Sequence, residues 1–438
     1  MNQRIEEETA ARGAADRAAP AAGSVPDGPG RIDPEQWPDV ARVPRSRVRA
    51  ALARVLLHQV ARRTGLGLQL PGGPAPAPGL PVMRVNRPDA FHRRLGVGGL
   101  IGFGEAYQAG DWDADDLAGV LTALARSPQT LVPPRLQWLR RLYVPRHPAS
   151  EHNTPDGARD NIRRHYDLSN DLFALFLDPT MTYSSALFEE DAAGRPVAEW
   201  GLLEAAQHRK IDRLLDLVGV GKGTRLLEIG SGWGELALRA ARRGATVLTL
   251  TLSEEQRDLA VAKLDAAGVG DRVEVRLQDY RAVDGEFDAV VSVEMIEAVG
   301  AQYWPAYFAT IDRVLAPGGK AAVQAITMAH ERVEATKDTY TWIHKYIFPG
   351  GIIPSREAVE QVTAEHTGLR VVRADRFGQH YAETLRLWRE RFGARRGEVA
   401  ALGFDGVFRR MWDLYLAYSE AGFRTGYLDV QQLLLARG

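Results

Sequence analysis

The second half of the chain alternates between short apolar runs and segments of helical length. Five runs rich in leucine and β-branched residues have the lengths and flanking polar or glycine residues of buried strands: TRLLEIG, ATVLTLT, RVEVRL, FDAVVSV and GKAAVQAI. Strands that alternate with helices form a mostly parallel sheet with helices on both faces. The pattern therefore predicts an α/β domain, to which residues 369–438 add one or two late strands and a helix pair.

The first half of the chain predicts a smaller and mainly helical domain. Between Pro44 and Thr64, apolar residues recur on one helical face and arginines lie largely off it, which indicates a basic amphipathic helix. The apolar residues of that face are Val48, Leu52, Val55, Leu56 and Val60. After it come a loop rich in proline and glycine at 71–81, a strand at Val82–Val85, and helices at Pro88–Leu95 and Leu117–Leu124.

These patterns divide the chain into three regions. Residues 1–35 are rich in alanine, glycine, proline and glutamate without periodicity, which predicts a disordered tail. We expect residues 36–150 to form the N-terminal domain and residues 151–438 to form the α/β domain. Residues 134–148 alternate arginine with leucine, tryptophan and tyrosine, a composition typical of an interface. The N-terminal domain is therefore expected to face lipid or a membrane.

The distribution of charge agrees with a membrane partner and not with a nucleic acid. The whole chain carries 55 basic and 56 acidic residues, so it has no overall field that would attract a nucleic acid. Between Arg31 and Arg146, 17 arginines, no lysine and nine acidic residues give a net charge of +8. We expect this segment to bind anionic lipid.

Composition also excludes several locations and chemistries. No apolar run approaches 18 residues, and the first 20 residues carry acids where a signal peptide would be basic and apolar. We therefore expect a cytoplasmic protein that associates peripherally with the inner membrane surface. The chain has no cysteine, which excludes a thiol nucleophile and Cys-ligated metals. Its ten histidines form no pair with metal-ligand spacing, so we predict no metal site.

A glycine-rich turn is the most informative local signal. In LLEIGSGWGELALRAA, a buried strand leads through Gly230, Gly232 and Gly234 into a helix, as in sites for adenosine-containing cofactors. This motif alone fits a nicotinamide cofactor, S-adenosylmethionine, or only a tight turn. Glu228 would repel a pyrophosphate, and no acid ends the second strand to bind a nicotinamide ribose. These two features favour S-adenosylmethionine.

Several motifs in a fixed order now resemble one family. They are RPDAFHRRLGVGGLIGFGEAYQAGDW, RRHYDLSNDLFALFLDPTMTYSSALF, LLEIGSGWG, TLSEEQ, LQDYR, VSVEMIEAVG and WIHKYIFPGG. Together they resemble the cyclopropane-fatty-acyl-phospholipid synthases and mycolic acid cyclopropane synthases, which are S-adenosylmethionine-dependent lipid methyltransferases. The resemblance covers nearly everything after residue 80. It implies a Rossmann-like class I methyltransferase domain with a mostly parallel seven-stranded sheet.

The resemblance also implies which residues bind the cofactor. The methionine part is expected at Tyr183 and Ser184 with Gly230 and Gly232 beneath it, the ribose at Thr251 and Gln256, and the adenine at Asp279 and Tyr280. Apart from the resemblance, Glu228 lies two residues before the first glycine, where its carboxylate is expected to face the cationic amino acid moiety of the cofactor. A hydroxyl and an amide can satisfy two ribose hydroxyls as a carboxylate would. His165 and Tyr166 are expected to open the helix that covers the cofactor.

Methyl transfer to an alkene creates a carbocation, so a base must then remove a proton. The family resembled here holds a bicarbonate ion as this base, in a cradle made by Glu, Tyr, Cys and His. Glu297 and Tyr381 match the first two, whereas Ser185 and Gln324 stand at the positions of the other two, and Ala298 replaces a His beside the Glu. Aromatic residues around 303–308 and 340–349, with Phe377 and Tyr381, are expected to surround the cation and the acyl chain.

The altered cradle favours one branch of the family. Which proton the base removes is expected to decide whether the product is a cyclopropane ring or a methylene branch. We predict methylation of an oleoyl-type phospholipid chain to a methylene branch, the precursor of a 10-methyl chain, with a separate reductase and a possible homodimer as partners. A cyclopropane synthase, a small-molecule methyltransferase and a non-catalytic lipid-binding module remain as alternatives.

Overall fold

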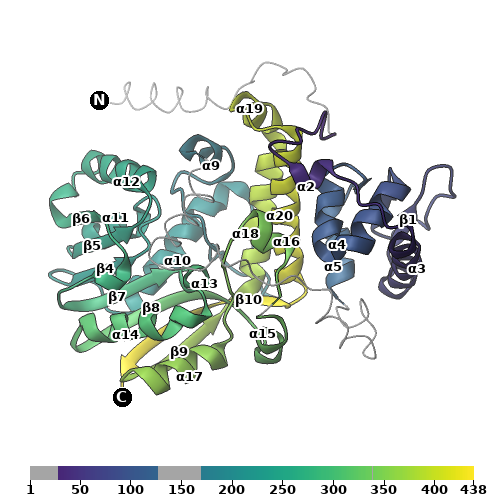
Figure 1. Ribbon diagram of the computed structural model, residues 1–438. Helices are drawn as coiled ribbons and strands as arrows, with labels where there is room; N and C mark the ends of the chain where they lie inside the picture. The colour runs from purple at the N-terminus through teal and green to yellow at the C-terminus, as the bar shows by residue number, and fades with distance from the viewer. Residues whose placement is uncertain (1–27, 127–168, 338) are drawn as a thin grey trace, which may run out of the picture.

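The computed structural model describes residues 28–126, 169–337 and 339–438. An α/β domain, a small N-terminal region and a set of C-terminal helices between them make up the described chain (Figure 1). The interfacial segment 134–148, His165, Tyr166 and most of the expected tail lie outside the described residues.

The seven-stranded sheet that the resemblance implied is present. Its strand order is β6-β5-β4-β7-β8-β10-β9, and β10 runs antiparallel to both of its neighbours. The five predicted runs form the first five strands of this sheet in chain order, and two late strands complete it. Their bounds are β4 (Arg225–Ile229), β5 (Thr246–Thr251), β6 (Val273–Leu277), β7 (Phe287–Val293), β8 (Leu315–Met328), β9 (Leu369–Arg376) and β10 (Leu428–Arg437).

Helices cover both faces of this sheet because its central strands are apolar on both faces. Leu226 packs in one hydrophobic cluster with α10 and α11, whereas the next residue, Leu227, packs in another with α14. Successive residues of a strand point to opposite faces, so such strands can only lie in a two-sided core. The helices of this domain are α10 (Leu203–Leu217), α11 (Glu235–Arg242), α12 (Glu254–Ala266), α13 (Ile296–Val299), α14 (Trp304–Val314), α15 (His330–Thr336) and α17 (Arg356–His366).

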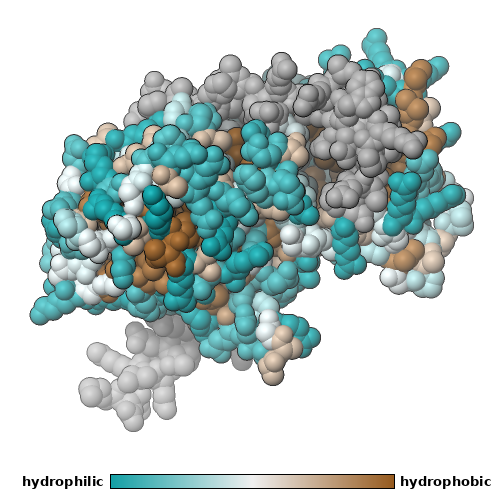
Figure 2. Space-filling model, turned by 90° about the horizontal axis from the view of Figure 1, so that it is seen from below, coloured by the Kyte–Doolittle hydropathy of each residue, from teal (hydrophilic) through white to brown (hydrophobic). Residues whose placement is uncertain are grey.

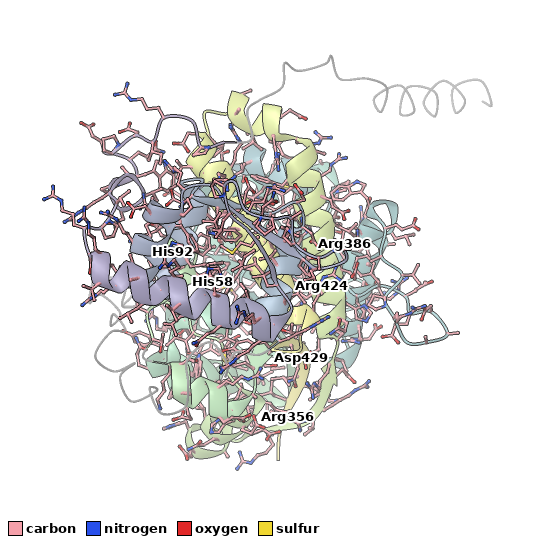
Figure 3. All side chains as sticks on the ribbon, turned by 90° about the vertical axis from the view of Figure 1, so that its right-hand side faces the viewer. His58, His92, Arg356, Arg386, Arg424 and Asp429 are labelled. Carbon is pink, nitrogen blue, oxygen red and sulfur yellow. The ribbon has the colours of Figure 1, made fainter. Side chains whose placement is uncertain are left out.

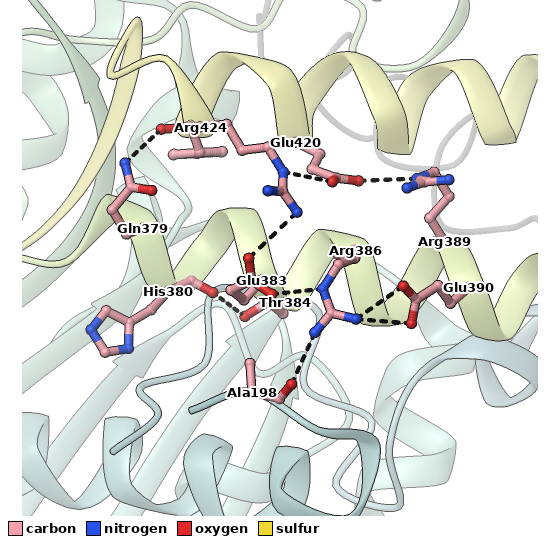
Figure 4. Close-up of polar contacts among 11 residues, drawn as sticks. Ala198, Gln379, His380, Glu383, Thr384, Arg386, Arg389, Glu390, Glu420 and Arg424 are labelled. Carbon is pink, nitrogen blue, oxygen red and sulfur yellow. Dashed lines mark hydrogen bonds and ion pairs between the residues drawn. The ribbon is translucent and has the colours of Figure 1, made fainter. Parts of the chain in front are cut away.

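The predicted C-terminal helix pair is α18 (Gly378–Ala394) and α20 (Gly406–Arg424), with the short α19 (Arg396–Ala401) between them. Buried ion pairs join the two long helices (Figure 4). Glu420, which is 1% exposed, accepts a hydrogen bond of 3.0 Å from Arg389 of α18 and one of 2.7 Å from Arg424. Of these two bonds, the one from Arg389 crosses between the helices, because Arg424 lies on α20 with Glu420. Arg424 also forms an ion pair of 3.4 Å with Glu383 of α18, and the two crossing contacts help to hold the helices side by side.

The N-terminal region is mainly helical, as predicted. It contains α2 (Pro38–Ala41), α3 (Arg47–Thr64), β1 (Gly67–Gln69), β2 (Val82–Val85), α4 (Pro88–Gln108), β3 (Trp112–Asp113) and α5 (Leu117–Ala125). The helix expected at Pro88–Leu95 continues to Gln108, through a kink at Gly99, whose φ is 55°. Glycine adopts this conformation without strain, so the chain can resume the helix in a new direction.

The amphipathic helix predicted between Pro44 and Thr64 is α3, and most of the apolar face named for it is exposed. In α3, only Val60 of the five predicted apolar residues is buried, together with Ala53, Leu57 and Ala61. Apolar residues cover more of this helix than one face, and the small alanines allow close packing against α4. Val48, Leu52, Val55 and Leu56 remain 73%, 61%, 53% and 42% exposed.

The N-terminal region shares a continuous hydrophobic core with the C-terminal helices. Arg410 of α20 donates to the carbonyl oxygens of Tyr107 and Trp112 at 2.7 and 3.0 Å. On a second helix, α16 (Trp342–Tyr346), the indole nitrogen of Trp342 donates to Gln108 at 2.8 Å. The region is therefore tied to the rest of the molecule by packing and by buried hydrogen bonds.

Replacing Gly104 by alanine should loosen this contact. A Cβ at Gly104 would lie 2.3 Å from Cδ1 of Trp342, so the buried indole would have to move. We expect Gly104→Ala to lower the free energy of unfolding by about 1–3 kcal/mol, as overpacking typically does. Denaturant titration measures this loss. The matched control is Gly98→Ala in the same helix, where nothing lies within 4 Å of a Cβ; an equal loss in the control would contradict the assignment.

Candidate active site

The glycine-rich turn lies between β4 and α11 and leaves space above it. Gly230, Gly232 and Gly234 have φ values of 96°, 49° and 87°, which L-residues rarely adopt. A Cβ on Gly230 would lie 2.6 Å from the side chain of Met295, whereas a Cβ on Gly232 would meet no protein atom within 4 Å. The protein itself therefore leaves the space at Gly232 clear, which fits a bound ligand there.

Glu228 lies beneath this turn at the end of β4. Its Oε2 atom accepts a hydrogen bond of 2.6 Å from the Thr249 hydroxyl, and that hydroxyl also lies 2.7 Å from Oγ of Ser231. Burial raises the pKa of Glu228 to about 8, against the opposing effects of the Thr249 bond and of Lys210. Glu228 thus stabilises the turn from below.

The structure brings together the two residues expected at the ribose. The Thr251 hydroxyl donates to Oε1 of Gln256 at 2.9 Å, and both side chains are buried at the carboxyl end of β5. The pair expected at the adenine is adjacent to them in the sheet. Asp279 forms an ion pair of 2.6 Å with Arg281, and the buried Tyr280 hydroxyl has no hydrogen-bond partner among the described residues.

The TYSS segment (residues 182–185) lies against the C-terminal helices and α10. The hydroxyls of Tyr183 and Tyr415 are 2.6 Å apart, which ties the segment to α20. The Oγ atom of Ser184 accepts a hydrogen bond of 2.6 Å from Lys210, which is fully buried on α10. Burial lowers the pKa of Lys210 to about 8, although Glu294, Asp178 and Glu228 act in the opposite direction.

Three of the four residues expected to form the anion cradle converge on a carboxylate that the sequence analysis missed. Oε1 of Glu294 accepts hydrogen bonds from the Ser185 backbone N–H at 3.0 Å and from Nε2 of Gln324 at 2.8 Å. Oε2 of Glu294 accepts a bond of 2.8 Å from the Tyr381 hydroxyl. The three residues thus surround a carboxylate that belongs to the protein itself.

The fourth residue, Glu297, is not part of this convergence. Its Oε1 accepts a hydrogen bond from the backbone N–H of Ile326, and its buried Oε2 has no partner among the described residues. Burial, and then repulsion by Glu294, raise the pKa of Glu297 to about 8. Two neighbouring buried carboxyls cannot both ionise readily, so Glu297 is mainly protonated at neutral pH.

Glu294 and Lys210 were missed, although the sequence carried weak signals for both. Glu294 and Glu297 occur in one motif, VEMIEAVG, and the resemblance singled out only the second glutamate. Lys210 is buried on α10. Other buried residues of this helix are Leu203, Ala206, Ile211 and Leu214. A lysine at helical spacing with buried apolar residues could have indicated a buried charge and hence a partner carboxylate.

The aromatic residues expected around the cation divide into two groups. Tyr307 and Phe308 pack in the sheet core beside Tyr280 and lie away from the cradle in a separate hydrophobic cluster. The ring of Tyr381 lies 4.6 Å from Phe423 and 6.2 Å from Trp388, and Trp388 lies 5.3 Å from Tyr183. The rings beside Tyr381 therefore come from α18 and α20.

Comparison with known proteins places this arrangement in a family. The family model for mycolic acid cyclopropane synthetase matches residues 153–433. The chain is 56% identical over 412 residues to tuberculostearic acid methyltransferase UfaA1 of Mycobacterium tuberculosis, covering 93% of this chain and 96% of that protein. It is 34% identical to the cyclopropane-fatty-acyl-phospholipid synthase of Escherichia coli over 389 residues, 87% of this chain and 93% of that protein.

Solved structures agree with this assignment. The cyclopropane synthase MmaA2 from Mycobacterium tuberculosis superposes with a TM-score of 0.57 at 34% identity and covers 64% of this chain and 98% of its own. The mycolic acid cyclopropane synthase CmaA1, complexed with S-adenosylhomocysteine (SAH) and CTAB, also gives 0.57, at 32% identity and 63% and 97% coverage. The chain therefore belongs to the mycolic acid cyclopropane synthetase family and is an S-adenosylmethionine-dependent fatty-acyl methyltransferase.

Proposed function

We propose that this enzyme methylates the double bond of an oleoyl-type phospholipid chain and releases a methylene-branched chain. The observation that carries the proposal is the 56% identity, over 93% of the chain, to a protein named as a tuberculostearic acid methyltransferase. The identity to the Escherichia coli cyclopropane-fatty-acyl-phospholipid synthase is lower, at 34%. Cyclopropane formation on the same substrate is the second candidate.

We assign the cofactor to the space above Gly232. The CmaA1 structure binds SAH, the product form of this cofactor, within the same fold. Tyr183, Ser184 and the glycine turn would hold its methionine part, while Thr251 and Gln256 would bind the ribose hydroxyls. When bound, S-adenosylmethionine supplies a methyl group that is electrophilic because it is attached to a sulfonium.

The balance of atoms corrects the expectation that a different proton is lost for each product. The π electrons of the alkene form the bond to the methyl carbon, the methyl–sulfur bond breaks, and the neighbouring chain carbon becomes cationic. If a methyl proton leaves at this stage, its C–H electrons close a cyclopropane. If a hydride first shifts from the methyl-bearing carbon to the cationic carbon, loss of a methyl proton gives C=CH₂. The order of the two steps decides the product.

A methylene branch becomes a methyl branch only by reduction, since a hydride and a proton must be added across the new double bond. None of the residues placed in the candidate site supplies a hydride. A separate reductase is therefore part of the proposal. The homodimer stays a prediction.

We further propose that α3 binds the enzyme to the membrane that holds its substrate. None of the helices within residues 28–126, 169–337 and 339–438 has the length and apolar composition needed to cross a bilayer. Instead, α3 lies along the side of the molecule that faces the viewer in Figure 3, where His58 is labelled. Figure 2 shows apolar residues interrupting the hydrophilic surface of the N-terminal region.

Charge on α3 favours an anionic bilayer as the partner. The helix contains five arginines and no acidic residue, and its exposed apolar side chains are Val48, Leu52, Val55 and Leu56. Exposed apolar side chains flanked by arginine match the composition of interfacial helices, in which each basic residue near an anionic surface contributes about 1 kcal/mol.

The product is the first test of the proposed function. Purified enzyme, S-adenosylmethionine and dioleoyl phospholipid vesicles should give a chain 14 mass units heavier than oleate, where the increment is that of one CH₂ group. Ozonolysis should cleave the new C=CH₂ bond and leave a ketone in the chain, whereas a cyclopropane resists ozone. An ozone-resistant product would show that the second candidate is correct.

Gly232→Val should abolish cofactor binding, because the added side chain would fill the space assigned to the ligand. The matched control is Gly268→Val, at a glycine that also has a positive φ (69°) and no atom within 4 Å of a Cβ, but lies at the end of α12. We expect both variants to lose about 1–2 kcal/mol of stability from backbone strain. Isothermal titration with SAH should detect no binding in the Gly232 variant alone; retained binding would refute the assignment.

Leu52→Glu with Leu56→Glu should weaken membrane association, because the two carboxylates remove apolar area and repel anionic lipid. Co-sedimentation with vesicles of phosphatidylglycerol and phosphatidylcholine measures it, and salt should weaken binding of the wild type. The matched control is Val372→Glu on β9, where the valine is 58% exposed in the α/β domain. Equal binding of the double variant and the control would rule out α3 as the docking surface.

A further inference from the structure

We propose that Glu294 is the base that removes the methyl proton, so that a side chain of the protein replaces the bicarbonate ion implied by the resemblance. The proposal rests on the proposed function, because it names the group that completes that reaction. Three observations support it: the contacts of the carboxylate, its place beside the cofactor site, and the backbone conformation that puts it there.

The contacts of Glu294 are those expected for a bound carboxylate anion. The backbone N–H of Ser185 and the Nε2 group of Gln324 can only donate, so Oε1 of Glu294 accepts both bonds. The Tyr381 hydroxyl completes the set at Oε2. These are three of the four residues at which an anion was expected, and each of them already has its acceptor.

A bicarbonate ion does not fit this cradle as it stands. Its oxygens would need the donors that Glu294 engages, and placing it there would bury a second anion against the first. Glu297 was also expected to help hold the ion. Its Oε1 instead accepts a hydrogen bond from the backbone N–H of Ile326. Among the described residues, the anion that these three donors bind is therefore the side chain of Glu294 itself.

Glu294 also lies where the reacting atoms are expected. It directly follows β7, and the next residue, Met295, packs against Gly230 of the cofactor turn. Its partner Ser185 follows Ser184, which is assigned to the methionine part of the cofactor. The carboxylate is therefore held between the glycine turn on one side and Tyr381 of α18 on the other.

The backbone of Glu294 has a conformation that is unusual for a residue other than glycine. Its φ is 51°, one of three positive values at non-glycine residues in the described part of the chain. Glycine would adopt this conformation without strain, yet the chain has glutamate. Strained residues persist where surrounding contacts hold them, and they concentrate at functional sites.

The surrounding charges suit a base. Burial raises the pKa of Glu294, while Lys210 and the three hydrogen bonds act in the opposite direction. The nearby Glu297 is mainly protonated at neutral pH and so adds little negative charge. A carboxylate with a raised pKa accepts a proton more readily than an exposed one.

The step balances without another reactant. The C–H bond of the transferred methyl group breaks, its proton goes to the Glu294 carboxylate, and its electron pair forms the second bond of C=CH₂. Glu294 is then a neutral carboxylic acid, and it must lose the proton to water before the next turnover.

Two variants of Glu294 separate its role as a base from its role in the structure. Glu294→Gln keeps the shape of the side chain and can still accept from Ser185 and Gln324 through its oxygen, but an amide cannot take the proton. Glu294→Gly relieves the backbone strain and empties the cradle. We expect each to reduce kcat at least about 100-fold, the lower range for loss of a general base, with SAH affinity retained. Glu294→Gly should also lower the melting temperature, because it leaves three buried donors without their acceptor.

Added anions provide the decisive comparison. Formate, acetate or bicarbonate should restore turnover to Glu294→Gly in a saturable manner, because Ser185, Gln324 and Tyr381 are then free to bind a small carboxylate. The same anions should not restore Glu294→Gln, in which the cradle is filled. The wild type should be equally active in bicarbonate-depleted and bicarbonate-supplemented buffer.

Each outcome bears on one proposal. Near-normal kcat in both variants, or stimulation of the wild type by bicarbonate, would overturn Glu294 as the base while leaving the proposed function intact. Absence of any methylated lipid from the wild type would instead refute the proposed function. Loss of activity in Glu294→Gly without rescue by any of the three anions would also count against the base, since a merely structural role predicts that result.

Discussion

The burial of Glu294 is the constraint on which the rest of the active site depends. An ionised carboxylate inside a protein is stable only when donors and a positive charge replace the water it has lost. The donors belong to Ser185, Gln324 and Tyr381, which are 109, 30 and 87 residues away in the sequence. Satisfying one carboxylate therefore requires the TYSS segment, β8 and α18 to meet at the end of β7.

The same requirement explains why the N-terminal region is packed against the C-terminal helices. Tyr381 is positioned by α18, which buried ion pairs fix to α20, and Arg410 of α20 is bonded to the N-terminal region. Tyr183 reaches Tyr415 on that same helix. The N-terminal region that carries α3 and the candidate active site are thus both attached to one helix, α20.

Much of this architecture could be predicted from the sequence, for physical reasons. Strands that are apolar on both faces can only be central strands of a covered sheet, so TRLLEIG and FDAVVSV were unambiguous. Ser185, Gln324 and Tyr381 were identified through motif positions, and they do converge. Glu294 was missed, because a positive φ at a glutamate depends on tertiary contacts that no local pattern encodes.

An internal base also gives a reason for the methylene branch. Ring closure and branch formation remove a proton from the same methyl group, and they differ only in whether a hydride shifts first. A base that takes the proton at once gives the ring, whereas a delayed transfer allows the shift. Glu294 is held by three donors that stabilise its anionic form and cannot move toward the methyl group without breaking them. If proton transfer to Glu294 is slower than the hydride shift, the more stable cation at the methyl-bearing carbon forms before the proton is lost, and the product is the methylene branch.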